Sequence, residues 1–132
     1  MSSPAVPGPS AMPVELGNLH RIGGGRAENL GLKPAEATID PPGISLLCCP
    51  TPQEAAHQIR TAFPAATRLH EAGRVIGSTT AAKIRAAGFE VIPDPTRRLP
   101  NHYRLIHPAG VAGFTDENLA HLSNAFTDTS GH

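Results

Sequence analysis

The sequence predicts a small α+β domain in which a mixed or antiparallel sheet packs against about three helices. Two observations lead to this prediction. Short apolar runs typical of strands are interspersed with segments of helical periodicity, and prolines interrupt these runs too often for a regular doubly wound sheet. The length of 132 residues corresponds to one domain of ordinary size.

The chain is expected to contain one folded domain with unstructured ends. Residues 1–13 include four prolines and no apolar period, which predicts a disordered leader. Residues 14–127 carry the periodic segments and would form the domain. The polar residues 128–132 would then be a flexible tail.

The amino-terminal half is expected to hold two strands and a helix. Residues 14–22 are typical of a first strand that ends at three glycines, and residues 30–42 are irregular. Residues 43–49 form an apolar run typical of a buried strand. Thr51 begins a helix, because proline follows it directly and glutamate follows three residues later, and Pro64 ends that helix.

The carboxyl-terminal half shows the same patterns at shorter lengths. Gly88 suits the left-handed conformation that ends a helix, and two prolines close the strand after it. The elements expected here are a helical turn or two at 65–71, a strand at 75–76, a helix at 80–87 capped by Ser78 or Thr79, strands at 89–92 and 102–107, and a last helix from Thr115.

Composition argues against several functional classes. The formal net charge is zero and basic residues are scattered, which disfavours general nucleic-acid binding. No apolar run is long enough for a transmembrane helix, so we expect no membrane association. The amino terminus lacks a signal peptide pattern, so the protein is expected to be cytoplasmic as synthesised, with export by a signal-less route left open.

The cysteines and the possible metal ligands predict no metal site. Cys48 and Cys49 are adjacent, which is too close for ordinary disulfide geometry, and they are expected to be reduced core residues. No Cys-x-x-Cys pair is present. Glu54 and His57 match half of a di-iron motif, but the chain has no second copy.

Titratable side chains are concentrated on the strand expected at 102–107. Strand alternation places Tyr103 on one face and both His102 and Arg104 on the other. His102 and Arg104 could together bind a phosphate or carboxylate, and an imidazole can exchange a proton near neutral pH. Alternatively, Arg104 pairs with Asp94 or Glu90 at the rim, and His102 only caps a turn.

Two further segments could bind an anion. Arg21 and Arg26 flank a glycine-rich loop whose amides could approach a phosphate closely, although a flexible turn explains the same residues. Ser78 and Thr79 precede a helix that carries Lys83, and helix starts attract anions. Hydroxyl side chains at such positions are, however, ordinary helix caps.

The block His102-Tyr103-Arg104-Leu105-Ile106-His107-Pro108 and the amphipathic helix after it resemble the end of small type VI secretion effector toxins whose fold is similar to ADP-ribosyltransferases. Gly43-Ile44-Ser45-Leu46 resembles the Gly-x-Ser strand of those proteins. Leu19-His20-Arg21-Ile22 falls where such a fold carries its first-strand basic residue. The chain contains no Glu-x-Glu or Gln-x-Glu, so the source of a catalytic carboxylate is left open.

The resemblance implies a toxin-like protein that acts on or with a nicotinamide dinucleotide, NAD. Arg21 would hold the pyrophosphate, Ser45 would brace the strand at the nicotinamide ribose, and Tyr103 would stack on a ring. A cleft is expected to unite these residues with His102, which stands in the place of the third motif. In full, the expected site comprises the catalytic residues His102, Tyr103 and Ser45 and the dinucleotide-binding residues Arg21, His20 and Arg104.

Other readings of the sequence remain open. A non-catalytic interaction module, such as an antitoxin, immunity protein or accessory subunit, would show a large exposed apolar patch and no cleft. A toxin would itself be expected to have a cognate antitoxin or immunity protein as its partner. A third reading is a phosphate- or nucleotide-sensing module that uses Ser78, Thr79 and Lys83.

Overall fold

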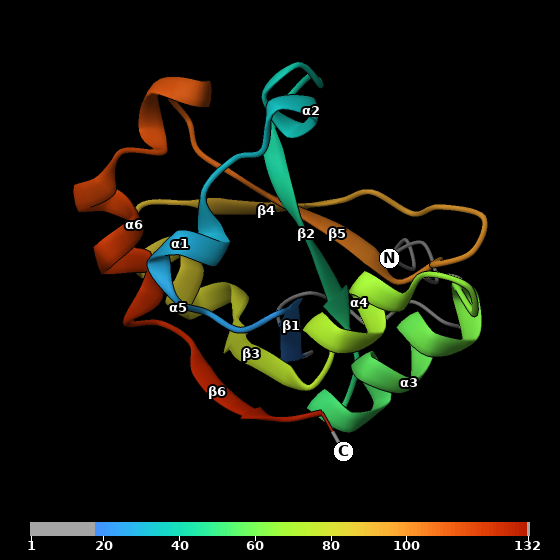
Figure 1. The fold of residues 1–132 in the computed structure, drawn as a ribbon. Coiled ribbons are helices and arrows are strands. Elements are labelled where there is room, and N and C mark those ends of the chain that lie inside the picture. Colours follow the sequence, from blue (N-terminus) through green and yellow to red (C-terminus); the bar gives the residue numbers. More distant parts are fainter. Residues whose placement is uncertain (1–17, 132) are drawn as a thin grey trace, which may run out of the picture.

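Within residues 18–131, which the computed structural model describes, six strands form one sheet in the order β4-β5-β2-β1-β3-β6 (Figure 1). Each neighbouring pair is antiparallel. The α+β class predicted from the sequence is confirmed. The strands are β1 (Asn18–Ile22), β2 (Gly43–Cys48), β3 (Val75–Thr80), β4 (Glu90–Pro93), β5 (His102–Ile106) and β6 (Thr127–Ser130).

The described region also contains six α-helices and one 3-10 turn, and three of these helices were expected. The helix at Thr67–Ala72 corresponds to the helical turn or two expected at 65–71, whereas Ala27–Leu30 and Pro34–Ala37 are single turns where no helix was expected. None of the helices in residues 18–131 is long and apolar enough to cross a membrane. The helices are α1 (Ala27–Leu30), α2 (Pro34–Ala37), α3 (Pro52–Ala62), α4 (Thr67–Ala72), α5 (Ala81–Ala86) and α6 (Asp116–Ser123), and the 3-10 turn η1 covers Gly110–Gly113.

Two apolar clusters cover the two faces of the sheet. In Figure 1, α1, α5 and α6 lie on one side and α3 and α4 on the other. Leu46 of β2 and Leu105 of β5 belong to the larger cluster, which includes residues of α5 and α6. Leu47, the neighbour of Leu46, points the other way and packs with Ile59 of α3, as strand alternation requires.

Hydroxyl side chains fix the starts of the longer helices. Thr51 accepts a hydrogen bond from the backbone N–H of Glu54 at the start of α3, and Thr115 caps α6 in the same way. The expectation that Ser78 or Thr79 caps α5 is wrong. The hydroxyl of Thr80 accepts the hydrogen bond from the backbone N–H of Lys83. Strand β3 continues further than expected, and this shifts the cap.

The carboxyl-terminal end also differs from the expectation of a flexible tail from residue 128. Residues Thr127–Ser130 form strand β6, which pairs with β3 from Val75↔Ser130 to Ser78↔Thr127. A polar strand of this kind gives no apolar signal, since all four of its residues are exposed. The predicted leader at 1–13 and the first residues of the predicted strand at 14–22 lie outside the described residues.

The two central strands separate soon after they pair. β1 pairs with β2 only at Leu19↔Cys48 and His20↔Leu47, whereas β1 pairs with β3 along its whole length. Arg21 and Ser45 lie just beyond the last β1–β2 pair. The sheet is therefore open between β1 and β2 at the point where Arg21 leaves β1.

Candidate functional site

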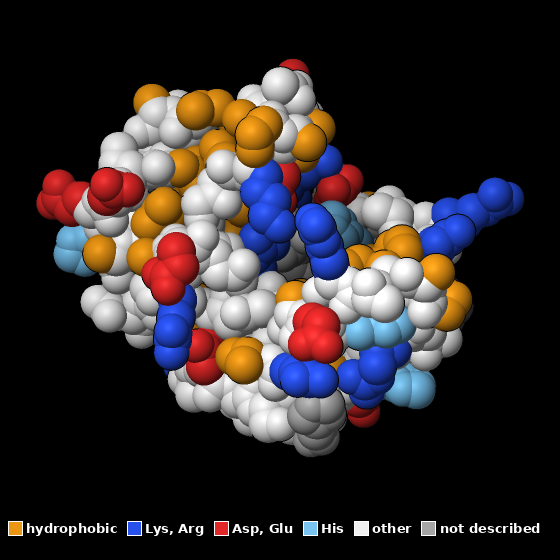
Figure 2. Space-filling model, in the orientation of Figure 1, with side chains coloured by type: hydrophobic (Ala, Val, Ile, Leu, Met, Phe, Trp, Pro, Cys, Tyr) orange, Lys and Arg blue, Asp and Glu red, His pale blue; other side chains and the backbone are white. Residues whose placement is uncertain are grey.

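A cleft of about 550 Å³ lies at the opening between β1 and β2. Lys and Arg side chains gather around a hollow in this face of the molecule (Figure 2). The wall formed by α3 and α4 is apolar, with Ile59, Phe63 and Leu69, and the other walls are polar, with more cationic than acidic side chains. The polar and charged lining residues are His20, Arg21, Asn29, Lys33, Glu36, Ser45, Thr96, Arg97, Arg98 and His102.

Arg21 is a buried cation that has no carboxylate partner among the described residues. Its side chain is 6% exposed, its Nε donates to the carbonyl oxygen of Asn29 at 3.0 Å, and its Nη1 donates to that of Ser45 at 3.2 Å. Burial lowers the pKa of Arg21, and the charge of Glu36 opposes this shift. Because a guanidinium keeps its proton in proteins, the cleft contains a poorly hydrated positive charge that an anion would stabilise.

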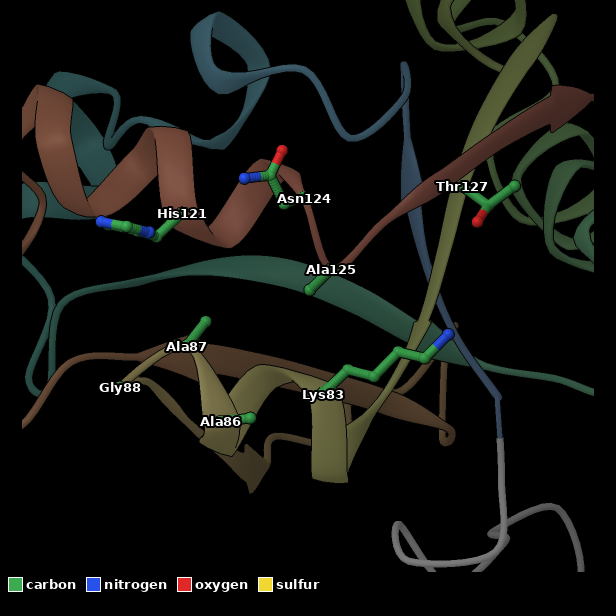
Figure 3. A pocket seen from close by; sticks show the side chains of 8 residues that line it. All are labelled: Lys83, Ala86, Ala87, Gly88, His121, Asn124, Ala125 and Thr127. Atoms are coloured by element: carbon green, nitrogen blue, oxygen red, sulfur yellow. The ribbon is translucent and has the colours of Figure 1, made fainter.

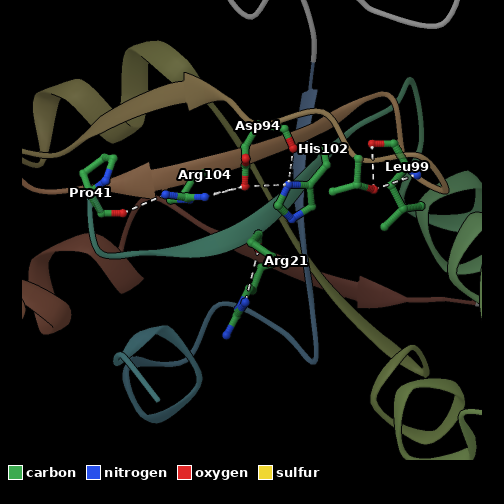
Figure 4. Close-up of polar contacts among 8 residues, drawn as sticks. Arg21, Pro41, Asp94, Leu99, His102 and Arg104 are labelled. Atoms are coloured by element: carbon green, nitrogen blue, oxygen red, sulfur yellow. Dashed lines mark hydrogen bonds and ion pairs between the residues drawn. The ribbon is translucent and has the colours of Figure 1, made fainter. Parts of the chain in front are cut away.

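His102 is held by one ring nitrogen and exposes the other side of its ring to the cleft. Nδ1 lies 2.8 Å from the carbonyl oxygen of Asp94 and 3.3 Å from its carboxylate. In the view of Figure 4 the ring lies between Asp94 and Arg21. Since a carbonyl only accepts, Nδ1 carries the hydrogen, and in the neutral ring Nε2 is left as an acceptor. The geometry therefore provides an oriented imidazole that can take up a proton.

Asp94 is itself fixed by Arg104. The guanidinium of Arg104 donates to Asp94 Oδ2 from Nη2 at 2.9 Å and from Nε at 3.3 Å, and its Nη1 donates to the carbonyl oxygen of Pro41 (Figure 4). Arg104 does not line the cleft. The expected dinucleotide-binding role of Arg104 is thus not supported, and the alternative, pairing with Asp94, is the arrangement present. Arg104 is connected to the cleft indirectly, through Asp94 and His102.

Ser45 and Glu36 add a hydroxyl and a carboxylate to the lining of the cleft. Ser45 is exposed in the cleft, and its hydroxyl makes no hydrogen bond within the described residues. Glu36 is the one carboxylate among the residues lining the cleft in the described part of the chain. Its Oε1 accepts from the backbone N–H of Lys33 at 2.9 Å. Glu36 therefore provides a carboxylate at the site, although it does not belong to a Glu-x-Glu pattern in the sequence.

His20 lines the cleft but is a structural residue. The side chain is 1% exposed, with Nε2 2.9 Å from the carbonyl oxygen of Cys49 and Nδ1 2.8 Å from the hydroxyl of Ser78. Nε2 therefore carries the hydrogen, and Nδ1 accepts from Ser78. Both nitrogens are used, which leaves none for a dinucleotide, so the expected contact from His20 is not supported. Burial lowers the pKa of His20 and keeps the ring neutral.

The buried neutral state of His20 predicts a loss of stability at acidic pH. Unfolded His20 takes up a proton near its ordinary pKa of about 6.5, whereas folded His20 takes one up only at lower pH. As the pH falls from the ordinary pKa toward the lower pKa of the folded state, the unfolded state binds more protons than the folded state. The free energy of unfolding therefore falls over this interval. Urea unfolding at pH 8 and pH 5.5 measures this loss, which we expect to be smaller in His20→Gln. An equal loss in both proteins would assign it to other groups.

Tyr103 lies on the opposite face of the sheet. It is 7% exposed and belongs to the larger apolar cluster, together with Leu46 and Leu105. It is not among the residues that line the cleft, so the expectation that it stacks on a bound ring is wrong for this site. The reason is strand alternation, since its neighbour His102 points into the cleft.

The glycine loop after β1 does not offer its amides to an anion. Gly23 donates to the carbonyl oxygen of Val75 and Gly25 donates to the Asp128 carboxylate at 2.7 Å. The side chain of Asn29 donates to the carbonyl oxygens of Ile22 and Gly24 and holds the loop. The loop is a fixed structural turn beside Arg21, in agreement with the reading of these residues as a turn.

A second hollow lies between α5 and the segment from α6 to β6 (Figure 3). Lys83 and His121 line it, but their side chains extend in different directions. The hydroxyl of Ser78 is hydrogen-bonded to His20, and Thr79 is buried with a hydroxyl that has no partner among residues 18–131. The residues of the expected phosphate-sensing site are therefore not gathered around one hollow.

The cysteines do not supply a nucleophile. Both are free and buried. Burial raises the pKa of Cys49 to about 12 and also raises that of Cys48. The expected reading of these residues as reduced members of the core is confirmed.

Sequence reasoning missed the residues contributed by the loops. Lys33 and Glu36 come from the segment that was expected to be irregular, and Arg97 and Arg98 lie in the proline-flanked loop before β5. The guanidinium of Arg98 lies over the Phe63 ring, 5.3 Å from its centroid, and donates to the carbonyl oxygen of Ala62. The adjacent Arg97 and Arg98 could have indicated from the sequence that this loop contributes charge to a site. The position of Glu36, in contrast, depends on how its loop folds.

The cleft thus combines a cationic wall, an apolar wall and an oriented imidazole. A ligand that fits these walls carries a negative charge at one part and a flat apolar group at another. Arg21, His20, Ser45 and His102 come together in the cleft, whereas Tyr103 and Arg104 do not line it. Comparison with known proteins finds no family model, no curated protein and no solved structure that matches the chain.

Proposed function

We propose that this protein is a toxin-like enzyme that binds and consumes nicotinamide dinucleotide in the cleft between β1 and β2. The observation that carries the proposal is the convergence of Arg21, Ser45 and His102, which lie far apart in the sequence, in one cleft. The resemblance implies a cleft that unites these three residues with Tyr103, and of the four only Tyr103 lies elsewhere, in the larger apolar cluster.

The chemistry of the cleft walls supports this ligand. A dinucleotide has a doubly charged pyrophosphate between two ribosides with flat rings. Arg21 provides a buried charge for the pyrophosphate, and Lys33 and Arg97 add charge at the rim. Phe63 with Arg98 stacked on it, together with Ile59, provides an apolar surface on which a ring can pack.

The alternative, a non-catalytic interaction module, has less support. Such a module would show a large exposed apolar patch. The large exposed apolar side chains in the described part of the chain come from separate elements: Ile39 follows α2, Leu69 is in α4, Val75 is in β3 and Val111 is in η1. Of these four, only Leu69 lines the cleft.

Induced expression in bacteria, with the intracellular dinucleotide measured at the same time, tests the proposal. The native chain is expected to arrest growth and to lower the dinucleotide level, and His102→Ala at an equal soluble level is expected to do neither. His57→Ala is the matched control, because His57 is an exposed histidine of α3 outside the cleft. Normal growth and an unchanged dinucleotide level with abundant, folded native chain would contradict the proposal.

A further inference from the structure

The structure of the cleft also indicates what accepts the ribosyl group. Resting on the proposed function, we infer that His102 removes a proton from a neutral oxygen nucleophile, so that the acceptor is a hydroxyl group, either of water or of an alcohol. A guanidinium or a carboxylate would be a different class of acceptor. Two independent features of the cleft, the orientation of His102 and the distribution of charge, carry this inference.

The orientation of His102 is that of a base. Its Nδ1–H is bound to the carbonyl oxygen of Asp94, with the carboxylate of the same residue 3.3 Å away. The backbone N–H of Asp94 in turn donates to the carbonyl oxygen of His102 at 3.0 Å. These contacts fix the ring with Nε2 as the acceptor, and the side chain is 12% exposed at the cleft.

The charges around the cleft argue for a neutral acceptor. Arg21, Lys33, Arg97 and Arg98 line the cleft, and Glu36 is the only carboxylate among its described lining residues. A cationic acceptor such as a guanidinium would be repelled by this set of charges. A carboxylate acceptor would be attracted, but it has no proton to give and would leave the oriented imidazole without a role.

The chemical step balances with a hydroxyl acceptor. The bond from C1′ of the ribose to the nicotinamide nitrogen breaks, and its electron pair leaves with neutral nicotinamide. The oxygen of the hydroxyl group bonds to C1′, and its proton passes to Nε2 of His102 and then to solvent. With water the products are nicotinamide, ADP-ribose and a proton, and with an alcohol ADP-ribose carries the alkoxy group.

The experiment measures nicotinamide release and identifies the ribosyl product with the full chain in water, in dilute methanol and with agmatine, a guanidinium compound. We expect ADP-ribose in water, an additional O-methyl product in methanol, and no agmatine adduct. His102→Asn keeps an N–H that can bond to Asp94 but lacks Nε2, and it should lower kcat about 10²–10⁴-fold. His57→Asn should leave kcat unchanged.

Chemical rescue separates a base from a merely structural histidine. Added imidazole should restore part of the kcat of His102→Ala, because it can occupy the space left by the ring, and it should not accelerate the native chain. Native turnover by His102→Asn, lack of rescue, or formation of an agmatine adduct would each overturn the inference. Dinucleotide binding by the native chain without nicotinamide release would overturn the inference and leave the binding site intact. Absence of any dinucleotide binding would remove the proposed function and this inference with it.

Discussion

Arg21→Gln is expected to weaken binding of nicotinamide dinucleotide by about 100-fold. Removing one member of a buried, hydrogen-bonded charge pair costs about 2–5 kcal/mol, because the other charge is left buried without a partner. In the native chain the Arg21 guanidinium has only carbonyl partners in the described residues and is 6% exposed. Isothermal titration of the purified chain with the dinucleotide measures the change in Kd.

Arg26→Gln is the matched control, because the same charge is removed from an exposed position a few residues away that does not line the cleft. Its Kd should equal that of the native chain at equal ionic strength. Glutamine at position 21 can still donate to one of the two carbonyls, so the fold should be retained, and the circular dichroism spectrum checks this. If both variants bind as tightly as the native chain, Arg21 is not the anion site.

Gly77→Ala is expected to destabilise the protein by about 1–3 kcal/mol or more, which is the usual cost of overpacking. A Cβ at this position would overlap backbone atoms of Gly24 and Gly25, which cannot move aside as a flexible side chain could. Gly77 pairs with Arg21 across β1 and β3, so the strain would fall on the strand that carries the buried guanidinium. Urea unfolding followed by circular dichroism measures the free energy of unfolding.

Gly31→Ala is the control for the general effect of replacing glycine. A Cβ at Gly31 would meet only Leu119 Cδ1, at an ordinary 3.6 Å, and its φ of −72° suits any residue. Its free energy of unfolding should differ little from that of the native chain or rise slightly. Equal effects of the two substitutions would show that the contact between Gly77 and the glycine loop does not matter for stability.

Local signals in the sequence were sufficient for most of the fold. Thr51 and Thr115 could be recognised as helix starts from the sequence. The capping hydroxyl accepts a hydrogen bond from a backbone N–H only three residues later, so the signal is local. The apolar run that became β2 was recognisable from its own residues. Strand β6 could not be found in this way, because it is polar throughout and is a strand only through its pairing with β3.

The candidate site was predictable only in part, for a similar reason. Arg21 and His102 stood out because charged residues on short strands require an explanation. Tyr103 was assigned to the site on its chemistry, although alternation with His102 places it in the core. Lys33 and Glu36 reach the cleft through the fold of a loop, and no periodic pattern indicates where a loop lies.

The loop next to Arg21 depends on residues about a hundred positions further along the chain. The hydroxyl of Ser123 donates to the carbonyl oxygen of Gly25, and the Asp128 carboxylate accepts from the N–H of the same glycine. β6, which carries Asp128, closes the sheet against β3. During synthesis the cleft therefore cannot reach its final shape until residue 128 has left the ribosome.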